Sequence, residues 1–221
     1  MMQHRIRKLK RNLCILLLVA LSLCLWIHHL RSEADLLPAA SPVNAVENTK
    51  ACTVTLSLTG REGETALRLF ASVCEGTGIS PCVFVTTEWL EENGDLLPLL
   101  SGATLGLLYE DSPKRFTQKR TMAYMAEENQ RFLTATGSFP RYVRLPADED
   151  SKAVSSALTA YGQMAVGHSG TISDGPTGGA ILDCGLLDGT TGYLLARFYG
   201  ETLTANCPVV SLPALLNEED A

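Results

Sequence analysis

Histidine is scarce in this chain, and its scarcity limits the chemistry that the chain can support. The sequence has four histidines, and His168 is the only one after residue 31. Its seven cysteines form no CxxC pair and no Cys/His spacing of a zinc site, so a structural zinc site is not expected. The Gly-rich run 175–179 lacks the Lys-Ser/Thr pair of a phosphate-binding loop and predicts a turn.

Acidic residues are absent from the first part of the chain and abundant in the rest. Residues 1–31 hold six of the 18 Lys and Arg and none of the 24 Asp and Glu, which leaves 32–221 with a net charge of −12. An acidic body repels phosphate backbones, so nucleic-acid binding is excluded as the main task. With 46% hydrophobic and 19% charged residues, the chain can bury a core, which excludes wholesale disorder.

The N-terminus has the pattern of a signal peptide or a signal anchor. Basic residues precede the uncharged, Leu-rich run 13–27, which is closed by His28, His29 and Arg31. About 15 residues span roughly 22 Å as a helix, which is short of a ~30 Å hydrocarbon core unless the flanking residues lie at the interfaces. No small-x-small cleavage site follows directly. We therefore favour an uncleaved, single-pass anchor in the cell membrane, with a cytoplasmic basic tip and the C-terminal domain outside the cytoplasm, in a bacterial envelope.

Residues 32–50 mix Pro, Ser, Ala and acidic residues without periodicity and predict a linker. The remaining residues, 51–221, are then one domain. An exported domain can keep disulfides, but the number of its cysteines is odd, so at least one stays free. These cysteines are Cys52, Cys74, Cys82, Cys184 and Cys207.

From Ala51 onward, short β-rich runs alternate with amphipathic helical stretches. Strands are expected at 52–58, 79–86, 104–108, 142–145, 163–166, 180–183 and 209–212. Helices are expected at 64–75, 88–100, 112–136, 151–161, 190–199 and 213–219. This alternation over about 170 residues predicts an α/β fold with a parallel sheet, as a compact or incomplete (β/α)7-type barrel, because an eightfold barrel usually needs ~250 residues. A doubly wound open sheet is the alternative.

The expected strand ends resemble motifs of the polysaccharide deacetylases, the NodB-homology family of carbohydrate esterases. VTLSLTG (54–60) resembles the first motif, in which a strand ends in Thr-Phe-Asp-Asp-Gly, and FPRYVRLP (139–146) resembles the strand that carries Arg-x-Pro. The other similar segments are GISPCVFVT (78–86), GATLGLLYEDSP (102–113), GAILDC (179–184) and CPVVSLPALL (207–216). The resemblance covers roughly residues 52–216 and implies the deacetylase fold.

The resemblance also implies a divalent metal held by an Asp and two His, a second Asp as base and a late His as acid. The chain has other residues at these positions: Thr59, Gly60, Leu108, Ser112 and Cys184. Leu and Gly offer a metal no lone pair. We therefore expect no metal, no other cofactor and no catalytic residues, and a catalytically inactive protein that binds cell-wall glycan or an envelope protein.

Arg144 is the main family residue that is retained. The resemblance implies a catalytic Asp as its partner, and since that Asp is missing, Glu110 or Asp111 at the neighbouring strand end could neutralise the guanidinium. An internal salt bridge, ordinary solvation and contact with an acidic or hydroxylated ligand are all open. The expected binding residues are Thr59, Asp111, Arg144, His168, Asp183 and Cys184.

An active hydrolase on C–N bonds of cell-wall polysaccharide is the alternative function. Its rebuilt metal or acid/base site would use Asp111, Arg144, His168 and Asp183. His168 lies in a Gly-rich polar stretch typical of a solvated loop. Cys184 could act as a nucleophile only beside a group that lowers its pKa, and a buried or disulfide-linked thiol is the simpler expectation.

Overall fold

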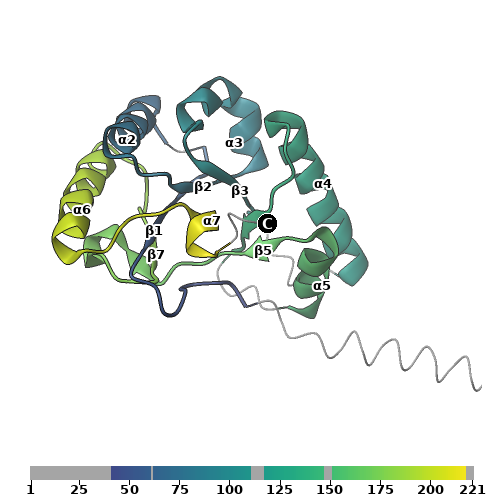
Figure 1. Ribbon diagram of the computed structural model, residues 1–221. Helices are drawn as coiled ribbons and strands as arrows, with labels where there is room; N and C mark the ends of the chain where they lie inside the picture. Colours follow the sequence, from purple (N-terminus) through teal and green to yellow (C-terminus); the bar gives the residue numbers. More distant parts are fainter. Residues whose placement is uncertain (1–40, 61, 111–116, 147–150, 218–221) are drawn as a thin grey trace, which may run out of the picture. The chain divides into compact units, whose positions relative to one another are not determined.

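Seven parallel strands form one sheet, curled into a half-barrel, in a computed structural model that describes residues 41–60, 62–110, 117–146 and 151–217 (Figure 1). The order of the strands is β5-β4-β3-β2-β1-β7-β6. Their bounds are β1 Thr53–Leu58, β2 Cys82–Val85, β3 Thr104–Leu108, β4 Tyr142–Arg144, β5 Met164–Ala165, β6 Gly170–Thr171 and β7 Ile181–Asp183. The predicted α/β class and incomplete (β/α)7-type barrel are confirmed.

Most of the described helices surround the outer face of the sheet, and the short helix α7 lies at its inner face (Figure 1). They are α2 Glu64–Thr77, α3 Thr87–Glu92, α4 Gln118–Thr136, α5 Lys152–Tyr161, α6 Thr191–Ala205 and α7 Leu212–Leu215. The single helix expected at 88–100 is wrong, because α3 ends at Glu92 and a tighter 3-10 helix, η1 (Gly94–Leu100), follows. Gly94 and Pro98 disfavour a continuous α-helix there.

Side-chain alternation along the strands builds two hydrophobic clusters, one on each face of the sheet. On β1, Val54, Leu56 and Leu58 are buried against the helices, whereas the hydroxyl residues between them face inward. The inner cluster is formed mainly by Cys82, Phe84, Tyr142, Val166, Ile181, Leu212 and Leu215. A parallel sheet that is covered on both faces has no solvated face, which explains why its strands are apolar with few charged residues.

The strand expected at 209–212 is wrong. Val209 makes only an isolated parallel bridge to Cys52. Helix α7 begins at Leu212, because the Ser211 side chain accepts a hydrogen bond from Ala214 N and Pro213 suits the first turn. The two-residue strand β6 was not predicted, since a Gly-Thr pair carries no periodic signal.

Residues 41–50, part of the predicted linker, are bonded to the barrel. Val43 N donates to Ala165 O at 2.9 Å, and Val46 N donates to Gly179 O at 2.8 Å. Gly179 has φ +77°, and a Cβ there would collide with the carbonyl oxygen of Val46. The predicted anchor 13–27 lies outside the described residues, and no helix within them is long and apolar enough to cross a membrane.

Candidate functional site

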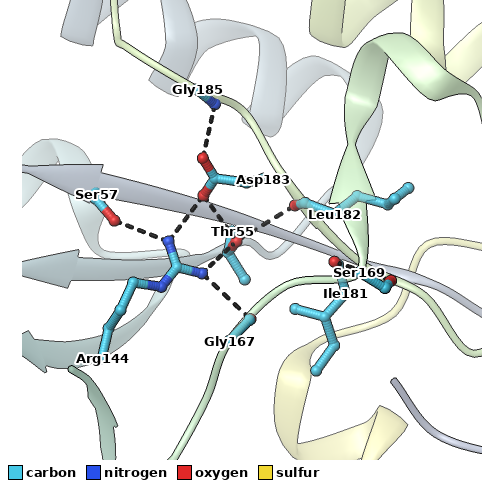
Figure 2. A network of polar contacts seen from close by, with 9 residues as sticks. All are labelled: Thr55, Ser57, Arg144, Gly167, Ser169, Ile181, Leu182, Asp183 and Gly185. Carbon is cyan, nitrogen blue, oxygen red and sulfur yellow. Dashed lines mark hydrogen bonds and ion pairs between the residues drawn. The ribbon is translucent and has the colours of Figure 1, made fainter. Parts of the chain in front are cut away.

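The side chain of Arg144 lies across the inner face of the sheet and joins three strands (Figure 2). It starts at the carboxyl end of β4. Nη1 donates to Ser57 Oγ and to Asp183 Oδ1, both at 2.8 Å, and Nη2 donates to Thr55 Oγ1 at 2.8 Å. A longer bond of 3.5 Å runs from Nη2 to Gly167 O. Arg144 therefore connects β4 with β1 and β7.

Arg144 can extend from β4 to β1 and β7 because the sheet curls and because the Phe84 ring on β2 packs against Gly106 on β3. The Arg144 Cζ lies 4.5 Å from the centroid of the Phe84 ring, which is a cation–π distance. The ring of Phe84 covers Gly106 on the next strand, and a Cβ on Gly106 would lie only 2.6 Å from its carbons. Glycine at this position lets the ring lie flat enough to support the guanidinium.

Asp183 is the carboxylate that neutralises Arg144. Its Oδ1 accepts from Arg144 and, at 3.1 Å, from Thr55 Oγ1, while Oδ2 accepts from Gly185 N at 3.0 Å. The two charged side chains are 10% and 17% exposed, so the pair is largely withdrawn from water. Of the alternatives that the sequence left open for Arg144, the structure contains the internal salt bridge, with Asp183 as its partner.

One donor of Arg144 is left over. Its Nε is buried and has no hydrogen-bond partner among the described residues. A buried unpaired donor costs ~1–3 kcal/mol. Since less than 1 Å² of this atom is accessible, a ligand cannot reach it in this arrangement.

The end of β1, where the family carries Asp-Asp, is closed by Glu62. The Glu62 carboxylate accepts from Thr59 N at 2.8 Å, from Thr59 Oγ1 at 3.2 Å and from Gly60 N at 2.8 Å. Gly60 has φ +95°, a conformation that an aspartate would adopt only with strain. The loop therefore follows a glycine-dependent path at position 60, which does not suit the second of the two family carboxylates.

The residues present do not fit the divalent metal that the fold implies. Among the described residues, no group of three or more His, Cys, Asp and Glu side chains is arranged to hold a metal ion. The positions that would supply ligands from β1 and β3 carry Thr59, Gly60 and Leu108. Ser112 and Asp111 lie outside the described residues.

Cys184 and His168 do not join Arg144 and Asp183. Alternation along β7 puts Ile181 and Asp183 on the inner face, so Cys184 faces the outer, helix-covered cluster. Burial, and then the neighbouring Asp183, raise the pKa of the Cys184 thiol well above its usual range, which disfavours a nucleophilic thiolate. His168 is exposed on a loop. Ligand binding by the expected residues stays a prediction.

Four residues of this region were not predicted from the sequence: Thr55, Ser57, Phe84 and Glu62. The first two could have been found, because polar residues at every second position of CTVTLSL mark an inward-facing polar row. The aromatic support and the closure of the loop could not be found in this way, since both depend on contacts between different elements.

A separate hollow of about 340 Å³ lies where β2 and β3 end, against α3 and α4. Five glutamates line it together with Arg131, which pairs with Glu91 and Glu128 at 2.8 Å each. The hydrogen bond from Arg131 lowers the pKa of Glu91. The excess of carboxylates disfavours anionic ligands at this hollow.

No protein-family model and no curated protein matches this chain. Solved structures do match. A family 4 carbohydrate esterase from Bacillus anthracis has a TM-score of 0.70 at 17% identity over 86% of this chain and 93% of that chain. A CE4 family pseudoenzyme from the same organism has a TM-score of 0.69 at 15% identity, over 81% and 70%.

A third match is the chitin deacetylase from the fungal pathogen Colletotrichum lindemuthianum. Its TM-score is 0.67 at 12% identity, over 80% of this chain and 92% of that chain. A mutant of the CE4 pseudoenzyme with restored enzymatic activity also matches. The strand order, the curled sheet and these likenesses agree: the chain has the NodB-type polysaccharide-deacetylase fold.

Proposed function

We propose that this chain is a catalytically inactive, polysaccharide-deacetylase-like protein of the cell envelope. In this proposal, residues 13–27 anchor it in the membrane, and its domain outside the cytoplasm binds cell-wall glycan or an envelope protein. The observation that carries the proposal is that the charged side chains at the inner strand ends satisfy one another. Arg144 is neutralised by Asp183, and the end of β1 is capped by Glu62.

Hydrolysis by the family route needs a free carboxylate base and a metal-bound water. Asp183 is the carboxylate that pairs with Arg144, and both of its oxygens already accept hydrogen bonds. A carboxylate that is paired with a buried guanidinium is a weak base, because protonation would leave the guanidinium without its counter-charge. The donor set for a divalent cation does not fit either.

A rebuilt hydrolytic site is supported less well. It would need His168 and Asp183 to act together, but His168 is exposed while Asp183 is bound on the inner face. Polysaccharide as the ligand class is supported by the names of the matched structures, one of which is a peptidoglycan N-acetylglucosamine deacetylase.

The test combines binding and catalysis on the full chain in detergent. We expect chitopentaose, as a probe of N-acetylglucosamine polymers, to shift amide NMR signals near Arg144 and Thr59. We expect no release of acetate from it with added Zn²⁺ or Co²⁺. Metal-dependent acetate release that Asp183→Ala abolishes would overturn the inactive assignment, and unchanged spectra would direct the search to a protein partner.

Membrane anchoring has its own test. Replacing Leu17 by Arg puts a charge inside the apolar run, where insertion costs up to about 2.5–3.5 kcal/mol at the centre of a helix. We expect the native chain to stay in the membrane pellet after an alkaline carbonate wash and the Leu17→Arg chain to leave it. Release of the native chain by the same wash would contradict an anchor.

A further inference from the structure

The sheet sorts the five described cysteines into different surroundings. All five are buried. Cys82 belongs to the inner cluster, whereas the other four belong to the outer cluster, on the opposite face of the sheet. Cys82 is therefore separated from every other described thiol by the sheet itself.

Cys52 and Cys207 are held next to each other by the backbone. Cys52 precedes β1, where its N–H donates to Pro208 O at 2.9 Å and its carbonyl accepts from Val210 N at 2.9 Å. Cys207 follows α6, and its N–H donates to Thr202 O at 3.1 Å, which fixes the residue at the helix end. The two side chains are 0% and 5% exposed, and the Cys207 thiol is close enough to add to the effect of burial in raising the pKa of Cys52.

We propose that Cys52 and Cys207 are a disulfide-forming pair, which closes when the chain folds in the presence of a disulfide oxidant. The proposal rests on the proposed location outside the cytoplasm, where such an oxidant, a protein or small-molecule disulfide, is present. The two thiols lose two protons and two electrons in all and form one S–S bond. The oxidant gains both and leaves as two thiols.

The pairing is specific because the backbone holds Cys52 beside the segment that follows Cys207, where Cys52 bridges Val209. Cys74 and Cys184 are close enough for Cys74 to raise the pKa of Cys184, but among the described residues no backbone hydrogen bond outside the helices and strands ties their two segments together. Burial, with Cys207 as a further cause, raises the pKa of Cys52 to about 12. Thiolate is therefore rare in the folded state, so closure belongs to folding or to brief opening of the structure.

The linkage can be read from tryptic peptides, because cleavage after Lys and Arg separates the pair from the other cysteines. Cys52 lies in the peptide 51–61 and Cys207 in the peptide 198–221. Cys74 and Cys82 share the peptide 69–114, and Cys184 lies in 153–197. A disulfide between the first two peptides thus has a unique mass, two hydrogens below the sum of the reduced peptides.

The experiment starts from the full chain, reduced and unfolded in urea, then diluted into detergent with oxidised and reduced glutathione at pH 8. After folding is checked by circular dichroism, free thiols are blocked with N-ethylmaleimide and the protein is digested without reduction. We expect 51–61 linked to 198–221, and N-ethylmaleimide on the other cysteines. Cys207→Ser should lose the link, and the matched control Cys82→Ser should keep it.

The proposal would be overturned if, in the folded chain, N-ethylmaleimide blocks both Cys52 in peptide 51–61 and Cys207 in peptide 198–221. A disulfide from peptide 51–61 to peptide 69–114 or 153–197 would overturn it as well. The native chain decides this even if Cys207→Ser fails to fold. The same mapping on acid-quenched producing cells tests the location separately. A pair that closes with glutathione but is reduced in cells contradicts the extracytoplasmic location alone.

Discussion

Replacing Arg144 by Met should destabilise the domain strongly, because it leaves Asp183 as an unpaired charge at 17% exposure. Breaking a buried ion pair from one side costs about 3–5 kcal/mol. The hydroxyl groups of Thr55 and Ser57 lose a charged donor as well. Since a domain of this kind has ~5–15 kcal/mol of unfolding free energy in all, the loss would be a large part of it.

The double variant separates the pair from ordinary packing. Asp183→Leu alone should also cost about 3–5 kcal/mol, because it leaves the guanidinium without its counter-ion. Arg144→Met with Asp183→Leu puts two apolar side chains in the place of the pair and should recover at least ~2 kcal/mol relative to the sum of the single changes. Full recovery is not expected, since Gly185 N loses its acceptor.

Urea unfolding followed by circular dichroism measures these differences. Arg68→Met is the matched control: Arg68 pairs with Glu64 on the surface of α2, where both side chains are more than half exposed. Such a pair is worth ~0.3–0.5 kcal/mol. A loss below ~1 kcal/mol in Arg144→Met, or strictly additive losses in the double variant, would refute the view that a buried ion pair holds the inner face together.

Three further outcomes are expected. Gly106→Ala should cost ~1–3 kcal/mol in urea unfolding because its Cβ meets the Phe84 ring, whereas Gly102→Ala, which has open space, should change little. Hydrogen bonds from Thr190 lower the pKa of Asp188, so the ionised carboxylate stabilises the fold above about pH 3.8, and this contribution is lost as the pH falls further. In Asp188→Asn, the unfolding free energy should therefore depend less on pH in this acidic range. Burial raises the pKa of Cys82 from 9.0 to about 12, so the unfolding free energy of the reduced chain should fall as the pH rises through that interval. The buried Cys82 thiol should react with 5,5′-dithiobis(2-nitrobenzoic acid) only after urea is added. Fast labelling of Cys82 at pH 8 without urea would contradict this burial.

Strands and helices could be predicted where a long segment has one period. The β1 segment and the helix at Lys152–Tyr161 lie within one residue of their expected bounds. Short elements could not be predicted: β6 has two residues, and α7 depends on the Ser211 cap rather than on a periodic face.

The composition of the inner face was harder to predict than the strands. Arg144 could be singled out from its motif, but Asp183 as its partner could not, because β3, β2 and β1 lie between β4 and β7 in the sheet. The curl that brings these two strands together is a property of the whole sheet. Sequence order indicates which strands are successive, and it contains no measure of how far the sheet bends.

The position of β1 in the sheet has a consequence for how the protein is made. Thr55 donates a hydrogen bond to Leu182 O, a residue 127 positions later. At ~5–20 residues per second, a ribosome needs roughly 6 to 25 s to supply this partner. During that time the nascent chain presents an unpaired strand edge, which invites aggregation. A chaperone that covers this edge until β7 has emerged should therefore raise the yield of native protein.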